Sequence, residues 1–419
     1  MSEIKFWSSC IDRFLRYVTF DTQSAETTDS FPSTSKQLEL LRHLADELWQ
    51  LGLQEVSLDE FGYVMGTIPA TTEKENVPTI GFLAHVDTSP EMSGEGVKPI
   101  LHFNYQGQDL VLPDSPSTVL RLSDCPELRD EIGRDIITAS GTTLLGADDK
   151  AGIAEILGAA EFLMAHPEIP HGTLRIAFSP DEEVGRGMEH FSVSRFGAQY
   201  AYTLDGGGAG ELESETFCAD TLTLIFHGFN THPGYAKGKM VNSLKVAADF
   251  INRLPKDGLA PETTEGFDGY VHPNIAEASV ERTAIRFLIR DFDEKGLVQK
   301  EAYLEGLARQ TAADWPGTTI ELKVEESYRN MRTVLDQHPQ VISFAEQAIR
   351  RTGLEVKRSP IRGGTDGSRL SFMGIPTPNL FSGQHNIHSR LEWASVFEMH
   401  KAVEVIIELA KLWEESTGT

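Results

Sequence analysis

TIGFLAHV, residues Thr79–Val86, is a short and almost wholly apolar run. Such runs are typical of strands that are buried on both faces of a mostly parallel sheet. Pro78 stands just before the run, at a strand start, where a proline is tolerated. The segments Thr173–Phe178 and Tyr200–Leu204 repeat the apolar pattern. We therefore expect these three segments to be strands of one buried sheet.

Helical patterns alternate with the predicted strands. Thr34–Leu51 carries leucines at a spacing of three to four residues, and Ile153–Met164 has the same apolar periodicity. Strands that alternate with helices favour an α/β architecture in which helices cover both faces of the sheet. The sequence thus predicts a domain built on a mostly parallel mixed sheet flanked by helices.

The order of the predicted elements changes near residue 216. Strands are expected at 221–226, around 270, at 284–289 and at 319–324, and helices at 242–254 and 294–313. This order resembles the split βαβ arrangement of a ferredoxin-like domain. We predict an inserted ferredoxin-like α+β domain over 216–327, with the first domain formed by 1–215 and 328–419.

Charge and composition exclude several classes of protein. The 419 residues include 37 Lys and Arg against 63 Asp and Glu, a net charge of −26. Such an acidic surface repels nucleic acids and anionic membranes. Acidic and basic residues interrupt the apolar pattern of Met1–Phe20, which predicts an amphipathic helix and not a secretion signal. The three cysteines are far apart and predict neither a disulfide framework nor a cysteine zinc site. We expect a cytoplasmic protein without nucleic-acid or membrane partners.

Metal-capable or acidic side chains follow four apolar runs, where ligands collect in open α/β sheets. The first run ends in His85-Val86-Asp87. Residues two apart in an extended chain face the same side, so His85 and Asp87 can point together. A metal-binding imidazole usually gives its second N–H to an acceptor, a role that suits Asp87. The alternative is a solvent-facing pair at a strand end.

The other three runs each allow a structural explanation as well. Asp148 and Asp149 begin a predicted helix, where they could act as a cap and offset the helix dipole. The acidic turn 181–183 follows a strand-ending proline, so Glu182 and Glu183 could face one cavity or remain solvated. Adjacent acids repel one another unless a cation neutralises them. Asp205 precedes three glycines and could belong to an ordinary turn.

Far downstream, His385 and His388 offer further nitrogen ligands, although one of them could be a packing residue. Histidine and carboxylate ligands without sulfur suit zinc, manganese or cobalt. The carboxylates of Asp148, Glu183 and Asp205 and one hydroxide carry four negative charges, which two divalent cations neutralise. Two metals about 3.5–4 Å apart can share a carboxylate and a hydroxide and polarise a scissile carbonyl. A free glutamate could then transfer the proton.

Longer motifs point to a family. They are HVD at 85–87, GADDKAG at 146–152, SPDEEVG at 179–185, LDGG at 204–207 and IRGGTDGS at 361–368. These motifs resemble those of the zinc-dependent M20 metallopeptidases. YVTFDTQS at 17–24, THPGYAKGKMVNS at 231–243, IRDFD at 289–293 and the extended motif at 361–381 are similar to the tripeptide-aminopeptidase branch of that family. The similarity covers essentially the whole chain.

The resemblance implies a set of metal ligands. His85, Asp148 and Asp205 would hold one zinc ion, and Asp148, Glu183 and His388 would hold the other. Asp148 would bridge the two ions, and manganese or cobalt could replace zinc.

The resemblance also implies roles for residues that bind no metal. Glu182 would be the general base that deprotonates the metal-bridging water and later protonates the leaving amine, and Asp87 would orient His85. The inserted domain would be a lid that mediates homodimerisation, and its His232 would help to stabilise the tetrahedral oxyanion.

Two arginines suggest how the length of a substrate could be recognised. Arginine binds a carboxylate through paired hydrogen bonds. If Arg290 and Arg362 reach the cleft, they could anchor the C-terminal carboxylate of a short peptide at a fixed distance from the metals. Alternatively, one or both arginines neutralise Asp291, Asp293 or Asp366.

The function expected from the resemblance is release of the N-terminal residue from short peptides, chiefly tripeptides. An M20 carboxypeptidase or an N-acyl amino-acid deacylase is the main alternative, since the same metal pair can attack any amide. A peptide-binding protein without turnover is a more distant alternative, and it should lack the base or several ligands. Here Glu182 and all five expected ligands are present.

Overall fold

The chain is described by a computed structural model of residues 2–418, with side chains from Ser9 onward. It forms two compact units. The first unit comprises Met1–Ser214, Met331–Ser359 and Thr365–Thr419, and the second comprises Glu215–Asn330 and Pro360–Gly364. Pro360–Gly364 thus joins the second unit although it lies outside the inserted segment that we predicted.

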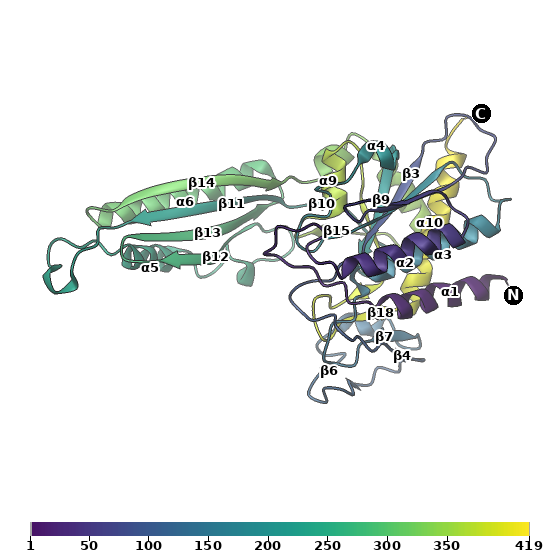
Figure 1. The fold of residues 1–419 in the computed structure, drawn as a ribbon, viewed down its shortest axis with the longest axis horizontal. Coiled ribbons are helices and arrows are strands. Elements are labelled where there is room, and N and C mark those ends of the chain that lie inside the picture. The colour runs from purple at the N-terminus through teal and green to yellow at the C-terminus, as the bar shows by residue number, and fades with distance from the viewer. Residues whose placement is uncertain (1, 419) are drawn as a thin grey trace. The chain divides into compact units, whose positions relative to one another are not determined.

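An eight-stranded mixed sheet forms the centre of the first unit (Figure 1). Its strands, in spatial order, are β1 (Gln54–Leu58), β2 (Val64–Ile68), β8 (Leu174–Ser179), β3 (Ile80–His85), β9 (Tyr200–Gly206), β16 (Asn379–Phe381), β10 (Glu211–Thr216) and β15 (Lys357–Ile361). The neighbours β8, β3, β9 and β16 are parallel, whereas β1–β2, β2–β8 and β10–β16 are antiparallel. The predicted α/β class is therefore confirmed, with a parallel centre to the sheet.

Helices cover both faces of this sheet. They are α1 (Ser2–Tyr17), α2 (Gln37–Gln50), α3 (Ala147–Ala165), α4 (Val193–Phe196), α7 (Arg332–Leu335), α8 (Pro339–Arg351), α9 (Asp366–Phe372) and α10 (Val396–Glu415). On one face Tyr202 of β9 accepts a hydrogen bond from Trp413 of α10 at 3.1 Å. On the other face Leu83 of β3 packs in one cluster with Phe196 of α4 and Leu370 of α9. Alternate residues of neighbouring strands therefore point into two separate cores.

The predicted helices of the first unit are present. Thr34–Leu51 corresponds to α2, Ile153–Met164 lies within α3, and the amphipathic N-terminal segment forms α1. Met1 lies outside the described residues. No helix in residues 2–418 combines the length and the apolar character that crossing a bilayer requires.

Two smaller sheets complete the first unit. One consists of β17 (Gln384–His385), β18 (Trp393–Ser395), β7 (Ile136–Thr138) and β4 (Ile100–His102), and the other of β5 (Leu110–Val111) and β6 (Val119–Leu120). Trp393 is fully buried against Tyr105, Leu128 and Ile136. The connection from β17 to β18, which carries His388, is thus anchored at its end by a packed core.

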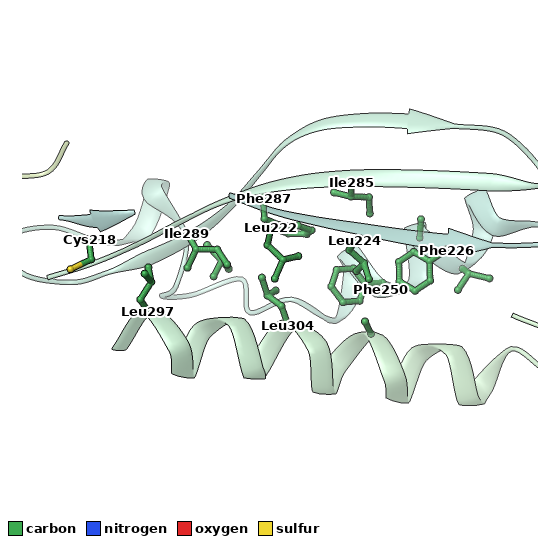
Figure 2. Packing of buried hydrophobic residues seen from close by; sticks show 14 residues of the cluster. Cys218, Leu222, Leu224, Phe226, Phe250, Ile285, Phe287, Ile289, Leu297 and Leu304 are labelled. Atoms are coloured by element: carbon green, nitrogen blue, oxygen red, sulfur yellow. The ribbon is translucent and has the colours of Figure 1, made fainter. Parts of the chain in front are cut away.

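The second unit has the element order β-α-β-β-α-β of a ferredoxin-like domain. Its elements are β11 (Cys218–His227), α5 (Ser243–Arg253), β12 (Tyr270–Ala278), β13 (Arg282–Asp291), α6 (Glu294–Asp314) and β14 (Thr319–Tyr328). The strands form an antiparallel sheet in the order β12-β13-β11-β14. Both helices pack on one face of this sheet. Leu222, Leu224 and Phe226 occupy alternate positions of β11 and lie on that face, in one buried cluster with residues of α5 and α6 (Figure 2).

Candidate metal centre

Three neighbouring parallel strands carry side chains to one edge of the large sheet. His85 is the last residue of β3, Asp205 lies near the end of β9, and Glu183 follows β8 by four residues. Because β8, β3 and β9 run parallel and lie side by side, their carboxyl ends meet at the same edge. Asp148 reaches this edge from the start of α3, and His388 from the connection between β17 and β18.

His85, Asp148 and Asp205 form the first group of possible metal ligands, with ligand atoms all within 4.8 Å of one another. His85 Nε2 lies 2.9 Å from Asp148 Oδ1 and 3.7 Å from Asp205 Oδ1. His85 and Asp148 are buried, and Asp205 keeps 14% of its side chain exposed. The first group therefore offers one nitrogen and two carboxylate oxygens at the carboxyl ends of the parallel strands.

Asp148, Glu183 and His388 form the second group, whose ligand atoms also lie within 4.8 Å of one another. His388 Nε2 lies 2.9 Å from Glu183 Oε2 and 3.2 Å from Asp148 Oδ2. The two oxygens of Asp148 therefore belong to different groups. All five residues expected to hold metal come together, and Asp148 stands between the two sets.

The neighbouring Asp149 does not behave as a simple helix cap. Its Oδ2 accepts a hydrogen bond from the backbone N–H of His85 at 3.1 Å, and its side chain is fully buried. Both aspartates thus contact His85 at the end of β3: Asp149 binds its backbone N–H, and Asp148 lies next to its Nε2. The alternative, that the two aspartates only cap the helix, is therefore wrong, because both of them contact His85 of β3.

Asp87 contacts both His85 and the acidic turn. The backbone oxygen of Asp87 lies 3.0 Å from His85 Nδ1, and its Oδ1 lies 3.3 Å from the same nitrogen. The carboxylate also accepts the backbone N–H of Glu182 at 2.9 Å and of Glu183 at 3.2 Å. The sequence had suggested only the contact with His85. Asp87 is fully buried and ties the turn that bears Glu182 to the end of β3.

A second set of contacts holds the acidic turn at Asp181. Asp181 has a positive φ of 58° and a fully buried side chain. It accepts hydrogen bonds from the Ser33 N–H at 2.6 Å and from Gln37 Nε2 at 2.6 Å, and its own N–H donates to Gln37 Oε1. The left-handed backbone at a non-glycine residue is thus stabilised by contacts with the start of α2.

The electrostatics of the cluster favour bound positive charge. Burial raises the pKa of Glu183 to about 8 and that of Asp205 to about 6, and the Asp148 carboxylate adds to both shifts. Burial lowers the pKa of His388, but hydrogen bonds to Asp148 and Glu183 raise it to about 11. Burial also raises the pKa of Glu182 well above its usual value, against the effect of His85. Crowded buried carboxylates of this kind require a cation or protons between them.

The ligand-bearing residues have further contacts that sequence analysis did not identify. Gln384 Nε2 donates to Asp205 Oδ1 at 3.1 Å, and Asn379 Oδ1 accepts the Asp205 N–H at 3.0 Å. Asp366, which was proposed as an alternative partner of the arginines, instead accepts a hydrogen bond at 2.7 Å from the Oγ of Ser179, the last residue of β8. No isolated sequence signal distinguishes Gln384 or Asn379, because they meet Asp205 only through the pairing of distant strands.

The structure separates the two downstream histidines. His385 Nε2 lies 2.6 Å from Glu398 Oε2, and its ring stacks on Trp393 with ring centroids 3.9 Å apart. His388 instead belongs to the second ligand group. His385 is therefore held by packing and by Glu398.

The three remaining predicted residues lie in the second unit. His232 is exposed, and its Nδ1 accepts the Gly234 N–H at 3.2 Å. Arg290 donates to the backbone oxygens of Asp220 and Ile289.

Arg362 donates to the backbone oxygens of Gly266 and Asp268, both at 2.8 Å. The acids proposed as alternative partners of the two arginines have other contacts. Asp291 pairs with Lys300, and Asp293 caps α6 through the Gly296 N–H.

The donor atoms of the first unit fit a pair of divalent cations. Imidazole nitrogens and carboxylate oxygens without sulfur suit zinc and similar transition metals. Glu183 Oε1 is buried and lacks a hydrogen-bond partner in the described chain, which leaves an acceptor directed at no protein donor. The splitting of the Asp148 oxygens between the two groups supplies the shared ligand that a two-metal site needs.

Comparison with known proteins places the chain in a family. Residues 141–412 match the family model described as Peptidase family M20/M25/M40. The peptidase T of Caldanaerobacter subterraneus is 48% identical over 97% of this chain and 99% of that protein. A peptidase T of Clostridium botulinum is 47% identical over 96% of this chain and 98% of that protein.

Solved structures share the fold over nearly the whole length. The aminopeptidase PepT of Bacillus cereus matches with a TM-score of 0.74 and 24% identity, covering 97% of this chain and 98% of that chain. A tripeptidase of Staphylococcus aureus matches with a TM-score of 0.75 and 22% identity, covering 98% and 99%. The family model and the full-length relatives show that the chain belongs to peptidase family M20/M25/M40.

Proposed function

We propose that this chain is a two-metal aminopeptidase that releases the N-terminal residue of short peptides, chiefly tripeptides. Its full-length relatives bear the name peptidase T, and a structure of the same fold is described as a tripeptidase. A metallo-aminopeptidase of the M20 family is the activity that these likenesses support. The single observation that carries the two-metal part is the position of Asp148, whose two oxygens face different histidines.

The residues of the site suit hydrolysis of a peptide bond. His85, Asp148 and Asp205 would hold one cation, and Asp148, Glu183 and His388 the other. Two divalent cations bound there would acidify water and polarise a peptide carbonyl. The chemistry of the ligands allows zinc, manganese or cobalt.

Glu182 is the residue that we assign as proton carrier. It lies on the turn between Asp181 and Glu183, and its backbone is fixed by Asp87. A partly buried carboxylate whose pKa is raised by burial can both accept a proton and return it. Glu182 would take the proton of the attacking water and deliver it to the leaving amine.

Length selection is the part of the proposal that rests on the second unit. Arg362 and Arg290 would anchor the C-terminal carboxylate of a tripeptide, and His232 would help to stabilise the oxyanion. His232 is exposed, and its Nδ1 accepts the Gly234 N–H, so its Nε2 is the nitrogen that would act on the oxyanion. We also propose that two copies pair through this unit, whose strand β14 is an edge strand with mostly exposed side chains.

The products of one substrate distinguish the proposed activity from its alternatives. Metal-loaded protein should convert Leu-Gly-Gly to leucine and Gly-Gly and should leave N-acetyl-leucine intact. Release of glycine and Leu-Gly would indicate a carboxypeptidase, and cleavage of N-acetyl-leucine would indicate a deacylase. Binding of the peptide without turnover would contradict enzymatic function altogether.

A further inference from the structure

Glu392 is a buried carboxylate whose oxygens bind the loop in front of Asp148. It is 1% exposed. Its Oε2 accepts the backbone N–H groups of Leu145 at 2.6 Å and Gly146 at 2.8 Å, and its Oε1 accepts that of Asp148 at 3.1 Å. We infer that Glu392 is a positioning residue for the metal centre, acting through the backbone of Asp148. This inference rests on the proposed two-metal function.

The loop needs such a partner because its backbone is irregular. Gly146 has a positive φ of 84°, and Asp148 has φ −79° and ψ 105°, so the chain is not yet helical where the shared ligand stands. The first N–H groups of a helix have no intrahelical acceptor. Buried N–H groups without an acceptor are destabilising. The carboxylate of Glu392 accepts three N–H groups, two from residues before α3 and one from Asp148. It thereby fixes Asp148, the residue that both ligand groups share.

Glu392 also connects two ligand-bearing segments that are far apart in sequence. It follows His388 by four residues and directly precedes β18, whose Trp393 is fully buried. The segment that carries His388 is thus bound to the loop that carries Asp148. His388 and Asp148 are 240 residues apart in the chain, yet their side-chain atoms meet at 3.2 Å. The hydrogen bonds of Glu392 fix the position of the His388 segment relative to the Asp148 loop.

Substitution by glutamine tests the carboxylate with little change in size. Glu392→Gln keeps one carbonyl oxygen and replaces the other oxygen with an NH₂ group, which cannot accept a hydrogen bond. At least one of the three N–H groups then faces a donor. Glu392→Asp keeps the charge but shortens the side chain by one methylene, so it serves as a second variant if the first does not fold.

The experiment measures zinc affinity by competition with a chromogenic chelator, starting from metal-free protein. We expect wild type to bind two ions and Glu392→Gln to bind both about 10–100-fold more weakly, because partners of ligating residues typically have effects of that size. Both affinities should fall because Asp148 belongs to both groups. Gln384→Ala should weaken chiefly one ion, since Gln384 contacts Asp205, which belongs to only one group.

A matched control removes a different buried carboxylate of the same unit. Glu131 is also 1% exposed, and it binds Ser395 Oγ and pairs with Arg134. Glu131→Gln should retain the wild-type zinc affinities. Thermal melting of the metal-free variants is measured in parallel, since a purely structural role would lower the melting temperature without weakening zinc.

The outcomes separate this inference from the proposed function. Wild-type zinc affinities in Glu392→Gln or Glu392→Asp, or weakening of one ion alone, would overturn the role of Glu392. A wild-type chain that binds no pair of ions would instead overturn the two-metal proposal.

Discussion

His85 and His388 direct their Nε2 atoms at opposite oxygens of a single carboxylate, that of Asp148, at 2.9 and 3.2 Å. The histidines come from segments about 300 residues apart, and no local sequence pattern connects them. Their common partner lies at the start of α3, where Glu392 binds the preceding loop. The arrangement of one carboxylate between two imidazoles is the geometric basis of the proposed chemistry.

Removal of the proposed base should abolish turnover while the metals stay bound. In Glu182→Ala we expect two zinc ions per chain and a kcat for Leu-Gly-Gly at least about 10²-fold below wild type, because general-base catalysis contributes that much or more. Elemental analysis and a ninhydrin assay measure the two quantities. Glu189→Gln is the control, since Glu189 pairs with Arg186 on the surface and should be active. A Glu182→Ala protein with most of its activity would refute the assignment.

Length preference should depend on Arg362 and not merely on the loop that it contacts. Arg362 also hydrogen-bonds Thr264 Oγ1 at 3.0 Å, so its removal changes the contacts of that loop. We expect Arg362→Ala to lose the preference for tripeptides over dipeptides and tetrapeptides, because the substrate carboxylate loses its partner. Thr264→Ala removes the side-chain contact of the loop with Arg362 and leaves the contacts with the backbone of Gly266 and Asp268, so it should keep the preference. Relative kcat/KM values measure this, and equal loss in both variants would exclude the arginine as a length ruler.

The core of the second unit should depend strongly on Phe287. This side chain lies on β13 and is fully buried in the cluster that the sheet forms with α5 and α6 (Figure 2). Phe287→Ala should lower the free energy of unfolding by about 3–5 kcal/mol, because it removes buried apolar surface and leaves a cavity. Val324→Ala, at a side chain that is 40% exposed, should cost less than about 0.5 kcal/mol. Urea titration followed by fluorescence compares them, and similar losses would contradict this view of the core.

Glu47 should make the free energy of unfolding of the first unit depend on pH. Burial raises its pKa, but hydrogen bonds from Tyr17 and Arg13 outweigh this effect and lower the pKa below the ordinary value. A carboxylate with a lowered folded-state pKa stabilises the protein above its unfolded-state pKa and loses that contribution as pH falls through the folded-state value. The stability difference between wild type and Glu47→Gln should therefore shrink toward acidic pH. Asp46→Asn, at an exposed position of the same helix, is the control.

The stability of these two proteins is measured by urea titration from neutral to acidic pH. A difference that stayed constant, or that grew as pH fell, would contradict the assigned role of Glu47.

Much of the fold was predictable because local patterns are strong. The apolar run at β3 and the leucine spacing of α2 identify those elements without knowledge of their partners. Strand ends were less predictable. β14 was expected to end at Val324 but continues to Tyr328, because it pairs with β11 as far as Ala219. That pairing depends on residues about 100 positions away and leaves no local signal.

The same distinction applies to the site. The candidate ligands could be proposed because acidic and imidazole groups stand where strands end, and the family resemblance supplied their grouping. Glu392 could not be predicted, since a single glutamate after His388 resembles any surface acid in sequence. Its meaning comes from three backbone N–H groups more than 240 residues away. A contact with a backbone N–H group does not depend on the side chain of the residue that donates it, so it cannot be predicted from the sequence of that residue.

Metal stoichiometry in two ligand variants tests the central claim most directly. Equilibrium dialysis with zinc followed by elemental analysis should give two ions per wild-type chain. Asp205→Ala should retain one ion, because Asp205 belongs to only one ligand group, whereas Asp148→Ala should lose both. One tightly bound ion in Asp148→Ala, or a wild-type chain that never binds more than one, would contradict a centre built around the shared carboxylate.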